Sequence, residues 1–381
     1  MRSQIRASTI FNGHRHITAN ERMGRWLLFG AYVANVLSNS ELLRAEFPGA
    51  LKHGFLVLAA LISLVRMPKR SLLAMFVASP LALIYVLGEM ELYAVMVLTL
   101  AAASPIMWAA IRSVVDRRDY RYILALAVVS LIPAALNWQT FVNEGFFSTM
   151  YGRPRMLMGY FHPKEAAVAF AIPMLLFMMT ATSAHTIFWM FAIVFLWAVG
   201  SRNTAMIVFL GWALRWHGRV VIAATLILIP ASIIWLAVSN NWYDTLDNLM
   251  SLRLTNWGEI LQAGRVVADA DLNFSDRFAA DNFFVEAYVL IGGISIVLTM
   301  VWVALWGAIV GRTVQLRSWA WIAFAMLLFN ACFDSGIAST GNLTHVFLWA
   351  VMCSPIFASK RRTAPPQAVA AGASSTIVPT Q

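Results

Sequence analysis

Residues 50–88 read ALKHGFLVLAALISLVRMPKRSLLAMFVASPLALIYVLG. Two apolar runs, each close to the roughly 20 residues that a membrane-spanning helix needs, flank a short basic gap at 66–70. The same alternation continues along the chain, which is 60% hydrophobic and only 12% charged. A soluble domain carries about twice that charged fraction. The pattern therefore predicts an all-α polytopic membrane protein.

We expect about twelve transmembrane helices in a single transmembrane domain over residues 26–359. Residues 1–25 are polar and basic, which predicts a cytoplasmic N-terminal segment without a cleaved signal peptide. Residues 360–381 are predicted to be a disordered cytoplasmic tail. The apolar runs are 26–40, 50–65, 71–88, 92–111, 121–138, 165–182, 186–200, 203–216, 219–239, 282–310, 318–333 and 343–359.

The distribution of charge orients these runs. With the N-terminus inside, the cytoplasmic segments hold 19 of the 28 Lys and Arg residues and 3 of the 18 Asp and Glu residues. Because Lys and Arg concentrate on the cytoplasmic side, we expect both termini there. Two long outer loops result, at 139–164 and 240–281. Apolar residues at helical spacing in the second loop predict an interfacial helix along the membrane surface.

The other nine basic residues lie on the outer side, against this charge rule, and Arg202 and Arg253 are two of them. Arg202 lies at a break between two runs, and Asn203 or Thr204 would cap the helix that follows. Free N–H groups and the helix dipole add to the guanidinium charge, so this point can bind an anion; simple anchoring is the alternative. Arg253 lies beside the apolar stripe of the interfacial helix, and either snorkels to lipid headgroups or faces a cavity beneath the helix.

Both long outer loops end in titratable residues. His162 precedes a helix whose first turn suits Pro163, and it can accept a proton, donate a hydrogen bond to an anionic substrate or contact a headgroup. Asp281 precedes the run 282–310, as its N-cap alone or as a catalytic group that orients the acceptor. Glu286 lies about one turn inside that helix, where a carboxylate should face a cavity or a basic partner.

Several classes of protein do not fit the composition. The positive charge lies in short loops between spans, which leaves no basic surface for nucleic acid. Cys332 and Cys353 both lie inside apolar runs and are too few for a disulfide framework or a metal site. We therefore expect no nucleic-acid partner, no cofactor and no metal.

Four polar segments share order, spacing and sidedness with motifs of one family of membrane enzymes. They are Gly159-Tyr160-Phe161-His162-Pro163-Lys164-Glu165-Ala166-Ala167, Gly200-Ser201-Arg202-Asn203-Thr204-Ala205, Arg253 with Trp257, and Asp281-Asn282-Phe283-Phe284-Val285-Glu286 followed by Leu290-Ile291-Gly292-Gly293-Ile294. Over roughly residues 150–300, the chain resembles the bacterial O-antigen ligase and polysaccharide polymerase superfamily.

The resemblance implies metal-independent glycosyl transfer at the periplasmic face of the bacterial inner membrane. The donor would be an oligosaccharide on polyprenyl diphosphate, and the partners would be membrane lipid, a flippase and chain-length regulator proteins. Arg202 and Arg253 would bind the diphosphate, with Arg155 and Arg277 as weaker candidates. Planar guanidinium groups suit this task because they bind phosphate oxygens in pairs and stay charged.

Two departures from the family pattern bear on the acceptor. Lys164 stands where the family has Asn after His-Pro, and Asp281 stands where the ligases have a His. The second departure favours a repeat-unit polymerase over a ligase that transfers to a lipid or protein acceptor. Asp281, with His162 or Glu286 as substitutes, would orient or deprotonate the acceptor hydroxyl.

A lipid-linked sugar flippase or a secondary transporter is the rival from a different class. Twelve spans with both ends inside suit it equally well. Transporters carry similar halves and polar groups near mid-membrane, whereas this chain has no evident repeat and its polar groups gather on one side. A purely structural membrane subunit explains neither the long outer loops nor their arginines.

Overall fold

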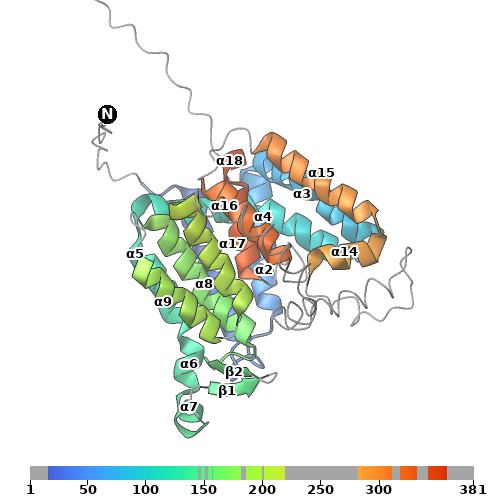
Figure 1. Ribbon diagram of the computed structural model, residues 1–381. Coiled ribbons are helices and arrows are strands. Elements are labelled where there is room, and N and C mark those ends of the chain that lie inside the picture. Colours follow the sequence, from blue (N-terminus) through green and yellow to red (C-terminus); the bar gives the residue numbers. More distant parts are fainter. Residues whose placement is uncertain are drawn as a thin grey trace, which may run out of the picture.

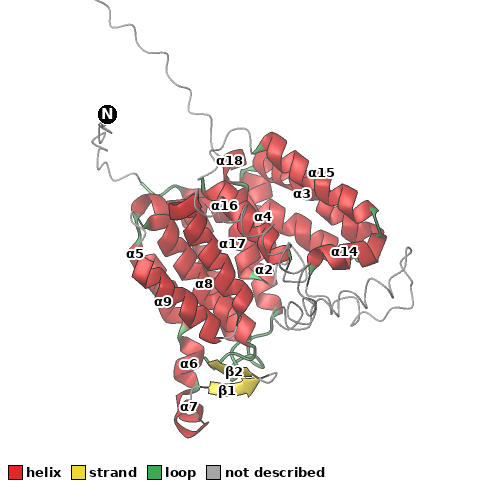
Figure 2. Cartoon of the chain, viewed as in Figure 1, coloured by secondary structure: helices red, strands yellow, loops and turns green. Residues whose placement is uncertain are grey.

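The structure is a computed structural model, and it is almost entirely helical where it is described (Figures 1 and 2). The described residues are 16–144, 147–150, 153–156, 158–181, 186–199, 201–218, 282–310, 318–332 and 342–357. They form fourteen bounded helices, namely α1 (Ala19–Ser38), α2 (Ala50–Arg66), α3 (Pro68–Leu87), α4 (Glu91–Arg117), α5 (Tyr120–Ser130), α6 (Ile132–Leu136), α7 (Trp138–Glu144), α8 (Pro163–Thr180), α9 (Thr186–Val199), α14 (Phe283–Ile291), α15 (Ile294–Ile309), α16 (Trp319–Ala331), α17 (Leu343–Met352) and α18 (Ser354–Phe357). Residues 202–218 are helical as well.

The all-α prediction is confirmed in the described part of the chain. Two of its helices, α3 and α4, are long and apolar enough to cross a bilayer. A buried core helix of a soluble protein meets the same criterion, so the expected number of spans stays a prediction. The run 219–239, the interfacial helix within 240–281 and the tail 360–381 lie outside the described residues.

Two expected spans are each divided, and backbone chemistry explains both divisions. The run 121–138 breaks at Leu131, between α5 and α6. Pro133 lies in the first turn of α6, where its missing N–H costs nothing. The run 282–310 divides at Gly292, whose φ of 63° ends α14. Glycine tolerates this left-handed conformation because it lacks a Cβ.

The segment 139–164, predicted to be an outer loop, is more structured than the sequence indicated. It contains α7 and an antiparallel pair of strands, β1 (Phe147–Met150) and β2 (Arg153–Met156), with Ser148 opposite Arg155. The pair lies at one end of the helical bundle, and α18 lies at the other (Figure 1). We call the first the hairpin end and the second the N-terminal end, because α1 also begins there.

Helices α4 and α17 form the centre of the bundle. α4 packs on α1, α2, α3, α8 and α17, and α17 packs on α16 and α8 as well. Every residue of α17 is buried. Helices α5, α8 and α9 lie on one side of this centre, and α3, α14 and α15 lie on the other (Figure 1). The first and last thirds of the chain therefore share one core.

Helices α1 and α4 approach each other closely at Gly24. A Cβ at this position would lie only 2.4 Å from the Ile106 carbonyl oxygen. We expect Gly24→Ala to destabilise the fold by about 1–3 kcal/mol, as overpacking does. The matched control is Gly54→Ala on α2, where an added Cβ meets nothing within 4 Å. Thermal unfolding in detergent tests this, and equal midpoints for the two variants would contradict it.

Arg25 and Asp119 form an ion pair that joins α1 to the start of α5 at the N-terminal end. The Arg25 guanidinium also lies 4.8 Å from the Tyr122 ring centroid, and the Tyr122 hydroxyl donates to the Arg25 carbonyl at 3.0 Å. Burial alone raises the pKa of Asp119. That pKa nevertheless lies below its ordinary value, because three effects together outweigh burial. They are the hydrogen bond from Arg25, the hydrogen bond from the Tyr122 N–H and the positive charge of Arg25.

This depressed pKa sets the sign of a pH dependence. The ion pair stabilises the fold at pH values above the ordinary carboxyl pKa of about 3.9. This stabilisation is lost as the pH falls through the lower pKa that Asp119 has in the folded state. Asp119→Asn keeps an N-cap for α5 but removes the charge. We expect its unfolding midpoint to be lower than that of the wild type at pH 7, and the difference to shrink towards pH 3.

Asp116 provides the control for this test. It forms an exposed pair with Arg112, at 3.1 Å, one turn earlier on α4. Such pairs contribute about 0.5 kcal/mol or less, so Asp116→Asn should hardly change the midpoint at any pH. Equal effects of the Asp116 and Asp119 substitutions at pH 7 would contradict the role of the Arg25 pair.

Candidate functional site

The helix over residues 202–218 begins with a polar turn that carries Arg202. The Ser201 hydroxyl accepts the Thr204 N–H at 3.3 Å and lies 2.8 Å from the Thr204 hydroxyl. Ser201 is therefore the cap, and the prediction that Asn203 or Thr204 caps this helix is wrong. The Arg202 guanidinium lies 5.4 Å from the ring centroid of Trp197 on α9. A guanidinium beside a helix N-terminus can bind an anion.

A buried chain of polar side chains continues from this turn into the bundle. The Asn203 side-chain amide donates to the Asn330 carbonyl oxygen on α16 at 2.6 Å. The Asn330 amide nitrogen in turn hydrogen-bonds Nε2 of His345 on α17. Both Asn330 and His345 are buried. We call Asn203, Asn330 and His345 the polar chain, and it fixes the start of the 202–218 helix against two other helices.

Neither Asn330 nor His345 was predicted as a site residue. Their signal is a polar side chain inside an apolar run, since both lie within predicted spans. A buried polar group of this kind is costly unless it is hydrogen-bonded, so its presence itself points to a partner. The identity of that partner depends on how α16, α17 and the 202–218 helix pack together. The spacing of residues in the sequence does not contain this information.

His162 acts as the N-cap of α8. Its Nδ1 accepts the Lys164 N–H at 3.1 Å, and Pro163 occupies the first helical position as expected. A neutral imidazole that accepts at Nδ1 carries its proton on Nε2. While the cap is in place, His162 can therefore donate a hydrogen bond from Nε2. This geometry favours the donor role over that of a proton acceptor.

The segment that precedes His162 is held between α1 and the start of α6. Gly159 has a φ of 70°, and a Cβ there would lie 2.1 Å from the Pro133 carbonyl oxygen. Tyr160 pairs with Ser40 in an isolated bridge, and its hydroxyl donates to the Ser130 carbonyl at 2.9 Å. Burial, more than any other factor, raises the pKa of Tyr160. Both residues thus place His162 at a fixed point.

Glu165 in the first turn of α8 joins this region to α1. Its Oε2 accepts the Asn39 side-chain amide at 3.1 Å, and the same amide donates to Asn35 at 3.2 Å. A carboxylate in the first turn also interacts favourably with the helix dipole. The segment from Gly159 to Glu165 is therefore joined at both ends to residues 39–41, which directly follow α1.

Glu286 lies in the first turn of α14, as expected, and is only 5% exposed. Asn282 is the N-cap of this helix, because its Oδ1 accepts the Phe284 N–H at 2.9 Å and the Val285 N–H at 3.2 Å. The alternative in which Asp281 is the cap is therefore wrong. Glu286 interacts electrostatically with Tyr85 of α3 and Tyr93 of α4, whose rings stack 5.7 Å apart.

The predicted site residues are thus placed only in part. Arg202, His162 and Glu286 all lie at helix starts, each with different neighbours: Trp197 of α9 for Arg202, the first turn of α8 for His162, and tyrosines of α3 and α4 for Glu286. Arg155 belongs to β2, and its side chain is outside the described part. Arg253, Arg277 and Asp281 lie outside the described residues.

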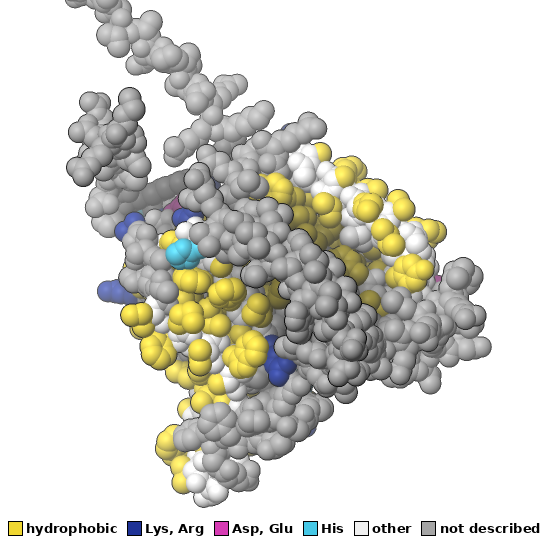
Figure 3. All heavy atoms as spheres, viewed as in Figure 1, with side chains coloured by type: hydrophobic (Ala, Val, Ile, Leu, Met, Phe, Trp, Pro, Cys, Tyr) yellow, Lys and Arg dark blue, Asp and Glu magenta, His cyan; other side chains and the backbone are white. Residues whose placement is uncertain are grey.

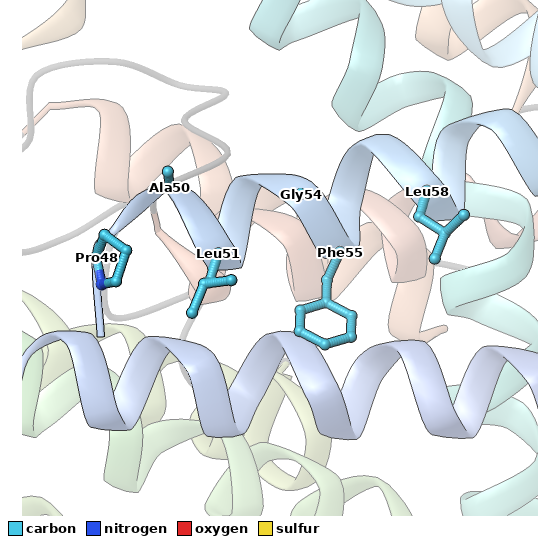
Figure 4. Close-up of a pocket in the computed structure, with 6 residues that line it drawn as sticks. All are labelled: Pro48, Ala50, Leu51, Gly54, Phe55 and Leu58. Carbon is cyan, nitrogen blue, oxygen red and sulfur yellow. The ribbon is translucent and has the colours of Figure 1, made fainter. Parts of the chain in front are cut away.

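Two grooves of the described structure are lined by no predicted site residue. One, of about 310 Å³, runs along α2 beside Pro48, Ala50, Leu51, Gly54, Phe55 and Leu58 (Figure 4). The other lies between α1 and α5 at the N-terminal end. Among the described residues, no group of three or more His, Cys, Asp or Glu side chains is placed to hold a metal ion.

Comparison with models of protein families, with curated proteins and with solved structures found no match.

The polar chain can be tested by a double-mutant cycle. Asn330→Ala and His345→Ala should each lower the free energy of unfolding by about 1–3 kcal/mol, because each leaves a buried polar atom without its partner. The double variant should lose clearly less stability than the sum of the two single losses. The reason is that the second substitution removes the polar group that the first one left without a partner.

Cys332→Ala, at the C-cap of α16, is the control for this cycle, since the Cys332 thiol donates to the Leu328 carbonyl of that helix. Its effect should add to that of His345→Ala. Additive effects of Asn330→Ala and His345→Ala would show that the two side chains do not act together.

Proposed function

We propose that the chain is a polysaccharide polymerase of the bacterial inner membrane. It would transfer glycan from a polyprenyl-diphosphate donor to an acceptor sugar hydroxyl at the periplasmic face, which corresponds to the hairpin end. The observation that carries the proposal is the placement of Arg202, at a helix start fixed by the polar chain. An O-antigen ligase-type transferase, with a lipid or protein acceptor, is the alternative of the same chemistry.

The apolar exterior supports a location in the bilayer. Soluble monomers rarely expose large contiguous apolar patches, whereas hydrophobic side chains cover much of the face in Figure 3. The exposed large hydrophobic side chains include Ile187, Phe191 and Val194 of α9, Leu72 and Phe76 of α3, and Ile296, Val297 and Met300 of α15. These helices lie on opposite sides of the bundle (Figure 1), as lipid on all sides would require.

Arg202 would bind the diphosphate leaving group. Free N–H groups at the start of the 202–218 helix point the same way as the helix dipole and add to the guanidinium charge. Donors that are fixed before the reaction stabilise developing charge without reorganising, and this effect is strongest away from water. Arg253, Arg155 and Arg277 would complete the cationic surface around the two phosphates.

The transfer itself would be a direct displacement. The acceptor hydroxyl oxygen attacks the anomeric carbon, the bond from that carbon to the diphosphate oxygen breaks, and its electron pair leaves with polyprenyl diphosphate. Asp281 or Glu286 would take the hydroxyl proton. His162 would donate a hydrogen bond from Nε2 to the sugar or a phosphate, because its Nδ1 is engaged in the cap.

Complementation of a strain that lacks this gene tests the proposal. Arg202→Gln and Arg253→Gln variants that still insert should lose long-chain polysaccharide, since removal of one such donor costs about 10²- to 10³-fold in rate. Arg202→Lys should retain part of the activity, because Lys keeps the charge but not the planar fork. Polysaccharide length on gels is the readout.

Arg44→Gln is the control, because Arg44 lies on the same predicted side of the membrane but outside the four family-like segments, with its guanidinium over Phe161. It should leave the polysaccharide at normal length. Normal-length product from both Arg202→Gln and Arg253→Gln would contradict the diphosphate role. Single lipid-linked repeats trapped inside the null strain would instead identify a flippase.

A further inference from the structure

The groove at the N-terminal end combines cationic and apolar walls. It has a volume of about 340 Å³ and lies between the start of α1 and the start of α5, far along the bundle from the hairpin end (Figure 1). None of its residues belongs to the proposed glycosyl-transfer site. It is lined by Ile17, Arg22, Arg25, Trp26, Phe29 and Tyr122.

The two arginines of the groove are held differently. Arg25 is engaged by Asp119 and by the Tyr122 ring, so its charge is largely balanced and its side chain is fixed in the wall. Arg22, one turn earlier, is exposed at the rim. Because a guanidinium binds phosphate oxygens in pairs, Arg22 is the group of this groove that can meet an anion.

The first turn of α1 holds this rim in place. Thr18 and Glu21 form a capping box, in which the Glu21 N–H donates to the Thr18 hydroxyl at 3.2 Å and the Thr18 N–H to the Glu21 carboxylate at 2.9 Å. The Arg66 guanidinium donates to Asn20 in the same turn at 3.2 Å. This contact joins the first turn of α1 to the end of α2.

The apolar wall of the groove is open. Trp26 is 70% exposed, although its indole is the largest apolar surface of α1. An indole that stays exposed at the end of an apolar helix is typical of the membrane–water interface. Phe29, one turn deeper, packs at 6.2 Å from the Tyr122 ring and continues this wall towards the centre of α1.

We propose that this groove binds an anionic diacyl phospholipid. The phosphate would lie against Arg22 at the rim, and one acyl chain would cover Trp26 and Phe29. Basic pockets between helices on the cytoplasmic side recognise anionic headgroups in this way. Free phosphate would leave the aromatic wall uncovered, and a zwitterionic lipid carries a cation that offsets the attraction of its phosphate to Arg22. The inference shares the bilayer placement with the proposed function and does not depend on glycosyl transfer.

The test uses the full-length chain in an uncharged detergent. Phosphatidylglycerol and phosphatidylcholine with the same acyl chains are titrated separately, and bound lipid is counted by native mass spectrometry. Arg22→Gln should weaken phosphatidylglycerol binding about fivefold, as expected for one cation near an anionic headgroup, and should leave phosphatidylcholine unaffected. Trp26→Ala should weaken the binding of both lipids.

Lys69→Gln is the matched control, because Lys69 is an exposed cation near the start of α3 that does not line the groove. It should change neither affinity, and inorganic phosphate should not displace bound phosphatidylglycerol. Equal losses for Arg22→Gln and Lys69→Gln, no preference between the lipids, or displacement by phosphate would each overturn the proposal. This test counts bound lipid and does not measure polysaccharide. The lipid site and the polymerase function can therefore be rejected independently of each other.

Discussion

The close approach of α1 and α2 to α4 around residues 104–106 is the constraint on which the bundle depends. Pro105 interrupts the backbone hydrogen bonds of α4, and Ser63 of α2 supplies an acceptor for the Ile106 N–H at 3.3 Å. Gly24 of α1 reaches the same turn because it has no side chain. Where water is excluded, a proline inside a helix is tolerated when neighbouring helices provide hydrogen-bond partners for the backbone groups that it leaves unpaired.

This packing explains the placement of polar side chains. With an apolar core and an apolar exterior, a polar group is least costly where a helix begins or ends, because unpaired backbone groups and caps are already present there. Asn39 and Glu165 meet between the end of α1 and the start of α8. Asn330 and His345 meet between the end of α16 and the start of α17. Each contact thus fixes a helix end that carries candidate site residues.

Much of the fold could be predicted from the sequence because it depends on composition and local chemistry. The apolar runs predicted the ends of α2, α3, α8 and α9 to within three residues, and Pro163 marked the start of α8. The break at Leu131 and the turn at Gly292 were missed, since a long apolar run hides a division that leaves its hydropathy unchanged. The hairpin was missed because Phe147–Met150 and Arg153–Met156 are short and lack a strong alternating pattern.

The site could be predicted less well, for a physical reason. Arg202 is recognisable as an exception to a charge rule, and His162 and Glu286 are recognisable as titratable residues at the ends of long loops. Neither criterion needs three-dimensional information. The caps show the limit of such reasoning: Ser201 and Asn282 perform the roles expected of Asn203 or Thr204 and of Asp281. Neighbouring polar residues compete to cap the same backbone N–H. Which of them becomes the cap depends on local geometry, which the spacing of residues does not encode.

The depth of the ionisable groups bears on the choice between surface chemistry and transport. A transporter places its binding groups near the middle of the membrane, commonly at interrupted helices. In the described chain, His345 is the third residue of α17 and Glu286 the fourth of α14. At about 1.5 Å per residue, both lie within one turn of a helix start. In the proposed bilayer placement, groups this close to a helix start would lie near the membrane surface and act on a substrate there.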